Sequence, residues 1–221
     1  MTDYELSDVA GIEELKERMA NADSIREWSF ILSDYISFGN SKLEKNIAIF
    51  NMNSATDCPN IGTENCQVPK EDCYAFKAEN MYNQPLPYRR RQEYLWDCLD
   101  AETFAKAFLE LVSRKRNSVD YLRFSEAGDF RHRGDIIKVD CIAEIIGEEG
   151  INVYTYSASD YLNWEEASNF TVNQSNFKSD YGNKAYTAIP EDMEPEEHEN
   201  LSDNAVQCPH EVSNGEISCG T

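Results

Sequence analysis

Three cysteines, Cys58, Cys66 and Cys73, lie within one short polar loop, CPNIGTENCQVPKEDC. Seven residues separate the first two and six separate the last two, so the loop must fold back on itself before the sulfurs can meet. The prolines and the glycine between them provide turn chemistry for such a path. Three thiolates on one loop suit a soft metal, either zinc with one further ligand or an iron–sulfur cluster that leaves one iron open. We therefore predict a metal site on this loop.

Further candidate ligands lie in the segment AVQCPHEVSNGEISCGT. Cys208, His210 or Cys219 could supply a fourth ligand to the cysteine loop. The two remaining cysteines have a different interpretation. Cys141 falls in helical register with apolar residues, and Cys98 has apolar neighbours in the chain, so we predict that both are buried small hydrophobes.

The elements that must position the loop alternate along the chain. A short apolar run, NIAIF, predicts a strand just before the loop. Helices are expected over 101–116 and 135–150, the second ended by Gly150, and strands over 119–125 and 151–157, followed by the strand-like segments FTVNQSN and KAYTAI. Such alternation predicts right-handed crossovers and a parallel sheet. Because the strands are too few for a complete eight-stranded barrel, the predicted fold class is α/β, a partial (β/α) barrel with parallel strands.

The N-terminal part reads differently. Residues 1–36 are predicted to form a helical N-terminal extension, because GIEELKERMANA carries apolar residues at helical spacing and a second helical segment opens at Asp23. Residues 37–221 are then predicted to form one α/β domain that carries the cysteine loop.

Polar residues follow the second and third predicted strands. The second strand leads into EAGDF, which places Glu126, Gly128 and Asp129 at the same sheet edge as the cysteine loop. The third strand ends in YTYSAS, so Tyr156 and Ser157 are expected to face the same pocket. Small residues and carboxylates at such an edge can approach a ligand closely or bind its amine. A plain strand-to-helix turn, capped by Asp129, is the alternative.

The composition narrows the class of protein. Lys and Arg total 20 against 41 Asp and Glu, a net charge of −21, which disfavours nonspecific binding of nucleic acid and is typical of a halophilic source. No apolar stretch reaches the length of a membrane span, and the acidic first residues do not resemble a signal peptide. We therefore expect a cytoplasmic protein. There, seven cysteines favour metal binding or catalysis over disulfides.

Two dense groups of cations stand out in this acidic chain. They are YRRRQEY, residues 88–94, and RHR, residues 131–133. Their arginines could bind a carboxylate or phosphate of a ligand. The alternative is that they pair with the surrounding acidic side chains.

Taken in order, several segments resemble the phage gene-product-88 family, which also occurs in viruses and archaea. They are FGNSKLEKNIAIFNMNSATDCPN, CQVPKEDCYAFKAE, LRFSEAGDF, VYTYSAS, VQCPH and EISCG, and together they span roughly residues 37 to 221. The layout of that family is similar to that of radical S-adenosylmethionine enzymes, with a three-cysteine loop after the first strand and a Gly-plus-acid motif after the second.

The resemblance implies specific roles. Cys58, Cys66 and Cys73 would hold a [4Fe-4S] cluster whose open iron binds S-adenosylmethionine, with the EAGDF residues near the amino group of that cofactor. One-electron reduction would then yield a deoxyadenosyl radical that abstracts hydrogen from a substrate. Cys208 and Cys219, with His210, would form a second metal site or complete the first.

The leading hypothesis is therefore a cytoplasmic iron–sulfur protein of viral or mobile-element origin, radical S-adenosylmethionine-like and acting on an unknown substrate. The alternative is a noncatalytic binding module stapled by zinc, in which the three loop cysteines and Cys208 or Cys219 close a tetrahedral site. A cluster with a purely structural or electron-transfer role is the third possibility.

Overall fold

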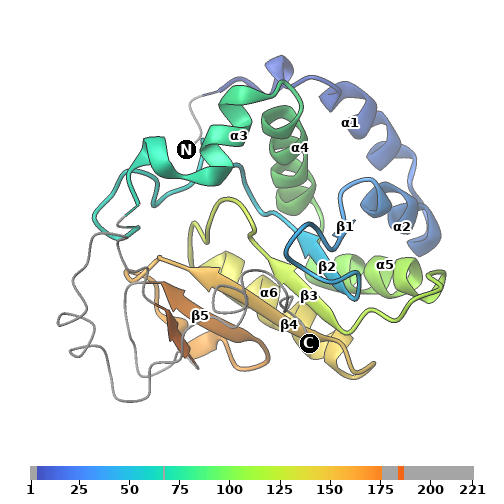
Figure 1. The fold of residues 1–221 in the computed structure, drawn as a ribbon. Coiled ribbons are helices and arrows are strands. Elements are labelled where there is room, and N and C mark those ends of the chain that lie inside the picture. Colours follow the sequence, from blue (N-terminus) through green and yellow to red (C-terminus); the bar gives the residue numbers. More distant parts are fainter. Residues whose placement is uncertain (1–3, 67, 176–183, 187–221) are drawn as a thin grey trace.

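A computed structural model describes residues 4–66, 68–175 and 184–186, the last range by its strand pairing alone. The chain forms a mixed α/β fold around one sheet with the strand order β1-β2-β3-β4-β5-β6 (Figure 1). The first pair is antiparallel and each later pair is parallel. The strands are β1 (Ser37–Phe38), β2 (Ile47–Phe50), β3 (Tyr121–Phe124), β4 (Asn152–Ser157), β5 (Thr171–Ser175) and β6 (Lys184–Tyr186). The predicted α/β class and parallel sheet are confirmed, and closure toward a barrel stays a prediction.

Six α-helices accompany the sheet in the part of the chain just defined. They are α1 (Ile12–Asn21), α2 (Ile25–Ser33), α3 (Tyr74–Met81), α4 (Pro85–Cys98), α5 (Ala101–Ser113) and α6 (Arg133–Gly147). Three single 3₁₀ turns, η1 (Leu6–Asp8), η2 (Lys70–Asp72) and η3 (Trp164–Glu166), link them. The four helices expected from the sequence are confirmed, whereas α3 and α4 were not predicted. Helix α6 ends at Gly147, three residues before the predicted end at Gly150.

Local capping chemistry explains where two of the helices begin. Ser24 accepts the backbone N–H of Glu27, and the Glu27 carboxylate in turn accepts the backbone N–H of Ser24, a complete capping box for α2. Asp100 accepts the backbone N–H of Thr103 at 2.8 Å and so starts α5. Both caps satisfy N–H groups that a helix terminus would otherwise leave unpaired.

The helices and the strands share one main hydrophobic core on one face of the sheet. Along β3, Leu122 and Phe124 point into this core, while Tyr121 and Arg123 alternate to the opposite face. The strands are neighbours in space in the same order as in the sequence. Because crossovers between parallel strands are right-handed, this order puts all of them on the same side of the sheet. Figure 1 shows α5 and α6 behind the sheet in that arrangement. The opposite face carries Tyr121 and Arg123 and is not covered by the main core, and it is named the open face.

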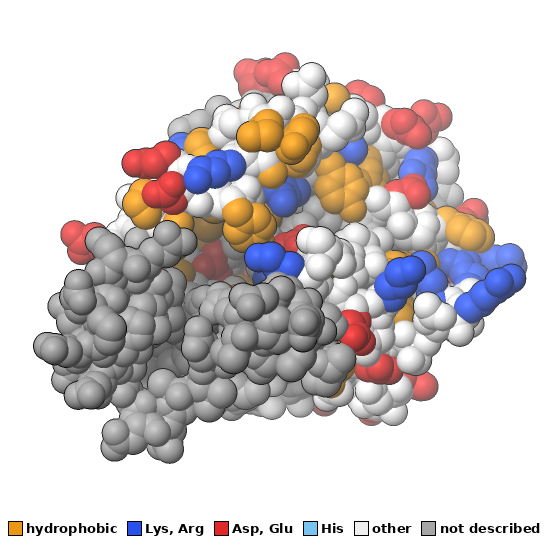
Figure 2. All heavy atoms as spheres, in the orientation of Figure 1, with side chains coloured by type: hydrophobic (Ala, Val, Ile, Leu, Met, Phe, Trp, Pro, Cys, Tyr) orange, Lys and Arg blue, Asp and Glu red, His pale blue; other side chains and the backbone are white. Residues whose placement is uncertain are grey.

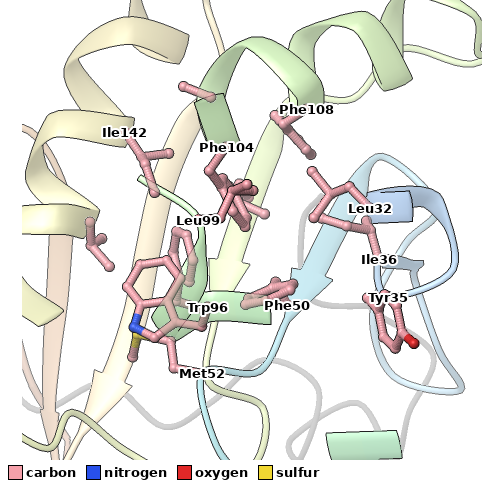
Figure 3. Packing of buried hydrophobic residues seen from close by; sticks show 14 of the residues in the cluster. Leu32, Tyr35, Ile36, Phe50, Met52, Trp96, Leu99, Phe104, Phe108 and Ile142 are labelled. Atoms are coloured by element: carbon pink, nitrogen blue, oxygen red, sulfur yellow. The ribbon is translucent and has the colours of Figure 1, made fainter. Parts of the chain in front are cut away.

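Aromatic rings form the centre of the main core (Figure 3). Phe50 packs edge-on against Phe104, with ring centroids 5.1 Å apart, and Trp96 lies 5.5 Å from Phe124. All four rings are fully buried and come from β2, β3, α4 and α5. The strand that leads into the cysteine loop is thereby fixed by two helices at once.

The N-terminal helices belong to the same core. Ile12 and Leu15 of α1 and Leu32 of α2 are buried in the cluster that contains the sheet residues. Helix α2 packs against α5, which Figure 1 shows at its side. The predicted extension therefore covers part of the α/β core.

Two cysteine predictions were wrong. Cys98 and Cys141 are exposed, not buried. The buried face of α6 is formed by Ile136, Val139 and Ile142, and Cys141 lies with the 40% exposed Ile137 outside it. Register with Ile137 and Ile145 was misleading, because Ile137 faces solvent and Ile145 is only half-buried.

A buried ionic network joins α4 to α6. Arg131 contacts Glu93 at 3.1 Å, Asp97 at 2.6 Å and Asp135 at 3.2 Å. Asp135 also accepts the indole N–H of Trp96 at 2.8 Å. One guanidinium is thus shared among three carboxylates. Burial raises the pKa of Glu93 to about 7 despite the lowering effect of Arg131.

This network predicts a pH dependence of stability. A neutral Glu93 is favoured in the folded protein, because its pKa rises from an ordinary 4.5 to about 7 on folding. Between these values the unfolded chain loses a proton that the folded chain keeps, so the free energy of unfolding should fall by roughly 3 kcal/mol as the pH rises. Glu93→Gln should remove that part of the slope in urea unfolding between pH 4.5 and 7.5.

Glu148→Gln provides the control, because Glu148 is an exposed glutamate just after α6. It should keep the wild-type slope. If both variants follow the wild-type pH dependence, Glu93 does not hold a proton in the folded state.

Candidate functional site

The cysteine loop leaves the carboxyl end of β2 and returns to the molecule at α3. Cys58, Cys66 and Cys73 are all partly buried. They lie close enough to interact electrostatically: burial raises the pKa of the Cys58 thiol, and Cys66 and Cys73 raise it further. The three predicted ligands are therefore brought to one region of the fold.

Backbone groups of the loop already point at two of the sulfurs. The backbone N–H of Asn60 is hydrogen-bonded to Cys58, and that of Val68 to Cys66, and each bond favours the thiolate. Within the described ranges, however, no three His, Cys, Asp or Glu side chains are arranged as a group that could hold a metal ion. Binding a metal would therefore require the thiols to approach one another. Cys208, His210 and Cys219 lie outside the described residues.

A buried carboxylate of α3 holds the start of the loop. Glu79 accepts the backbone N–H groups of Ala55 and Thr56, both at 2.8 Å, and the Thr56 hydroxyl at 2.7 Å. The Arg89 guanidinium of α4 contacts the same carboxylate at 2.7 Å, and the Glu79 side chain is fully buried. Because a buried charge is costly unless it is paired, this pair and its hydrogen bonds fix the path of the chain toward Cys58.

A second ion pair acts one residue before the first cysteine. The Arg90 guanidinium of α4 binds both carboxylate oxygens of Asp57, at 2.8 and 3.2 Å. Ser54 donates to Asp57 at 2.6 Å and accepts its backbone N–H at 2.9 Å. The bidentate geometry gives the loop a defined orientation as well as an anchor.

The Asp129 carboxylate connects three loops at the carboxyl edge of the sheet. One oxygen accepts the Phe130 backbone N–H at 2.7 Å and the Ser157 hydroxyl at 2.6 Å. The other accepts the Asn60 amide and the Ala158 backbone N–H, at 2.8 and 2.7 Å. Asp129 is only 4% exposed. These bonds tie the loops after β3 and β4 to the cysteine loop.

This arrangement gives Asp129 a positioning role. Each carboxylate oxygen already accepts two hydrogen bonds from the protein, which uses its ordinary acceptor capacity. Burial raises the pKa of Asp129, whereas the four donors act in the opposite direction. Direct binding of a ligand amine would have to displace one of these donors. Asp129 nevertheless remains close enough to raise the pKa of Cys58 and Cys66.

Asn53 and Gly128 form a close contact between the loops after β2 and β3. The Asn53 amide donates to the Asp129 carbonyl at 2.8 Å, and its oxygen accepts the Asp129 backbone N–H at 2.9 Å. Gly128 has φ +74°, and a Cβ there would lie 1.6 Å from the Asn53 amide oxygen. Gly128 is therefore required both for the backbone conformation and for the space that Asn53 occupies.

The remaining predicted residues are separated by the pleat of the sheet. Ser157 is buried beside Asp129, whereas Tyr156 is 39% exposed on the open face. Adjacent strand residues point to opposite faces, so these two side chains do not line one surface. Glu126 is half-buried at the edge, where its carboxylate accepts the Asn40 amide and its carbonyl accepts the Tyr74 hydroxyl.

A comparison with models of known protein families identifies the family of the chain. The family model described as Gene product 88 matches residues 28–202, which is more than half of the sequence. The chain belongs to the gene product 88 family. No curated protein and no solved structure matches it. The match begins inside α2, so it includes most of the second helix of the predicted extension.

The cationic groups of this gene product 88 protein are paired internally, as the alternative interpretation predicted. Arg89 and Arg90 pair with Glu79 and Asp57, and Arg131 is surrounded by three carboxylates. Arg133 pairs with Glu166 and Arg91 donates to the Ala10 carbonyl. Among the described residues no helix is long and apolar enough to cross a membrane.

Sequence reasoning missed the residues that build the site's frame. Asn51 accepts the Ala127 backbone N–H at 2.8 Å, and Asn53, Asn60, Asp57 and Glu79 act as described above. The polar run NMNSATD directly after a buried strand was the available signal. Short polar side chains often form hydrogen bonds with nearby backbone groups, so several of them at the carboxyl end of a strand indicate contacts with the backbone of the neighbouring loops.

The Asn53–Gly128 contact generates a stability prediction. Gly128→Ala should lower the free energy of unfolding by about 3 to 5 kcal/mol, because a left-handed φ is strained and the methyl group would displace Asn53. The control is Gly150→Ala, where φ is +80° but no atom lies within 4 Å of the new Cβ. That variant should lose only about 1 to 2 kcal/mol. Equal losses in urea unfolding would show that Asn53 adapts freely.

Proposed function

We propose that this gene product 88 protein is an iron–sulfur protein whose cluster is bound by Cys58, Cys66 and Cys73. The observation that carries the proposal is the placement of the three thiols. They share one loop at the carboxyl edge of a parallel sheet and lie near enough to influence one another's pKa. Three thiolates are the donor set that a [4Fe-4S] cluster with one open iron needs.

The surroundings of the thiols support a bound cation. Burial and the neighbouring thiols and carboxylate all raise the pKa of Cys58, so the loop without a metal keeps it protonated. A metal cluster would reverse that preference, because a coordinating thiol is deprotonated. The backbone N–H groups of Asn60 and Val68 would then stabilise the resulting thiolates. Hydrogen bonds to sulfur are also a known influence on cluster potentials.

The frame around the loop supports a site that is held in position. Two buried ion pairs, Glu79–Arg89 and Asp57–Arg90, fix the chain before Cys58, and Asp129 binds Asn60 just after it. Cys73 packs with Phe76 against the small buried residues Ala55, Ala75 and Ala127. The first and last cysteines are thus attached to well-packed parts of the fold.

The finer proposal is a radical S-adenosylmethionine-like enzyme built on a partial barrel. Sequential parallel strands with helices on one face are the arrangement that such a barrel requires. When bound, the cluster and S-adenosylmethionine would supply one-electron chemistry, and the chain would orient the substrate and exclude water. Glu126, a half-buried carboxylate at the edge, would receive the amine of that cofactor.

Metal content after anaerobic reconstitution with iron and sulfide tests the cluster. The wild-type protein should bind about four irons with matching sulfide and absorb broadly near ~400 nm, as thiolate-bound clusters do. Cys58→Ser, Cys66→Ser and Cys73→Ser should each lose most of this absorbance. Cys208→Ser and Cys219→Ser then report whether those residues take part.

The exposed cysteines Cys98 and Cys141 provide matched controls. Cys98→Ser and Cys141→Ser should retain the iron content of the wild type. Colourless protein that instead holds about one zinc per chain and unfolds with a chelator would overturn the cluster in favour of a zinc-stapled module. Iron that is lost equally in the three loop variants and in these two controls would show nonspecific binding.

The enzymatic part has a separate test. Reconstituted protein with S-adenosylmethionine and dithionite should release 5′-deoxyadenosine, and Glu126→Gln should reduce the yield while leaving the iron content unchanged. A protein that carries a full cluster but yields no deoxyadenosine would contradict the radical mechanism. It would instead favour a structural or electron-transfer role.

A further inference from the structure

Arg123 lies in the middle of the open face of the sheet. In the register of β3 it stands between Ile49 of β2 and Tyr154 of β4. Its neighbours in the strand, Leu122 and Phe124, point into the main core on the other side. The main core therefore does not cover the Arg123 side chain.

The Arg123 guanidinium lacks the partners that the other half-buried arginines have. Its Nε is buried and has no hydrogen-bond acceptor among the described residues. Arg89, Arg90 and Arg131, which are similarly buried, each contact at least one carboxylate at 3.1 Å or less. In a chain with a net charge of −21, carboxylates are abundant, yet among the described residues Arg123 contacts none, whereas Arg91, which also lacks a carboxylate, donates to the Ala10 carbonyl.

One aromatic ring lies beside this guanidinium and two more continue from it along the same sheet face. The Tyr156 ring lies 5.2 Å from its central carbon, and Tyr154 lies 6.3 Å from Tyr156. Tyr121 continues the row, 6.2 Å from Tyr154. A cation framed by rings on one sheet face suits a ligand that joins a negative group to a planar part.

The same region adjoins the cysteine loop. Arg123 lowers and Cys73 raises the pKa of Tyr74, so both lie within electrostatic range of one side chain. Two residues after Arg123, Ser125 is 4% exposed with φ 59°, and its hydroxyl also has no partner in the described part of the chain. The carboxyl side of β3 thus presents two buried polar groups that the described protein does not satisfy.

We propose that Arg123 binds the anionic group of a small ligand, a phosphate or a carboxylate, while Tyr154 and Tyr156 contact its planar part. A guanidinium offers a planar set of donors that matches both anions. That this ligand is the substrate of the radical chemistry rests on the proposed function, whereas the anion site itself does not. The site lies one residue from the end of β3, on the face that a barrel would enclose.

The test uses three probes with the same ring and different charge: phenyl phosphate, benzoate and benzyl alcohol. Calorimetric titration of the full chain, without iron, should show binding of at least one anion and at least tenfold weaker binding of the alcohol. The stronger anion identifies the chemistry of the ligand. Arg123→Gln should weaken anion binding at least tenfold, and Arg123→Lys should retain part of it.

Arg116→Gln is the matched control, because Arg116 is an exposed arginine beyond α5 and the same charge is removed. It should bind the anions as the wild type does. Equal weakening in both variants would overturn the proposal, since it would reflect net charge alone. If Arg123→Gln does not fold, Tyr156→Leu should still weaken binding of the anion, and unchanged affinity would count against the site.

Because the titration contains no iron, its result is independent of the cluster. If the protein binds an anion but holds no iron after reconstitution, the Arg123 site is supported and the radical mechanism is contradicted. If the protein holds a cluster but binds no anion, the cluster is supported and the Arg123 site is contradicted. Binding of benzyl alcohol as tight as that of both anions would show an apolar surface and contradict the role of Arg123.

Discussion

The buried carboxylate of Asp129 is the constraint on which the site depends. Its four donors come from the loop after β2, the loop after β3 and the loop after β4, so one side chain sets the spacing of three segments that are distant in sequence. A buried charge costs free energy unless it is fully hydrogen-bonded, and removing one donor would leave that cost uncompensated. The loops therefore hold together as a unit, and Cys58 is positioned through Asn60.

The same principle organises the other side of the cysteine loop. Glu79 and Asp57 are carboxylates with little or no solvent access, and each is neutralised by an arginine of α4. Such pairs add little net stability compared with apolar contacts, but breaking one is costly. Figure 2 shows acidic and basic side chains spread over the visible surface as well. What distinguishes the buried pairs is that they fix the path of a loop whose own backbone forms no strand or long helix.

The sequence predicted the elements well where periodicity and caps agree. Asp100 and the apolar face of α5 defined a helix, and the runs NIAIF, VDYLRFS and INVYTYS defined parallel strands. It failed for α4, whose Gln92 and Glu93 are buried polar residues that hide the apolar stripe. It also predicted the sheet edge as the site while leaving open which of its residues bind a ligand and which hold the frame, because only the contacts distinguish these roles. Asp129 illustrates this. Its position in the sequence matches that of a ligand-binding acid, but its carboxylate is hydrogen-bonded to three segments of the protein and holds them together.

The two faces of the sheet carry different kinds of side chain. Phe50 and Phe124 of the sheet pack with Phe104 of α5 at the centre of one face. The other face combines aromatic rings with Arg123, and its polar groups become more numerous toward the carboxyl ends of the strands. Because strand residues alternate, a single strand such as β3 contributes to both faces without conflict. Within the described residues the Arg123 Nε and the Ser125 hydroxyl have no hydrogen-bond partner, and a ligand bound at the open face would supply one.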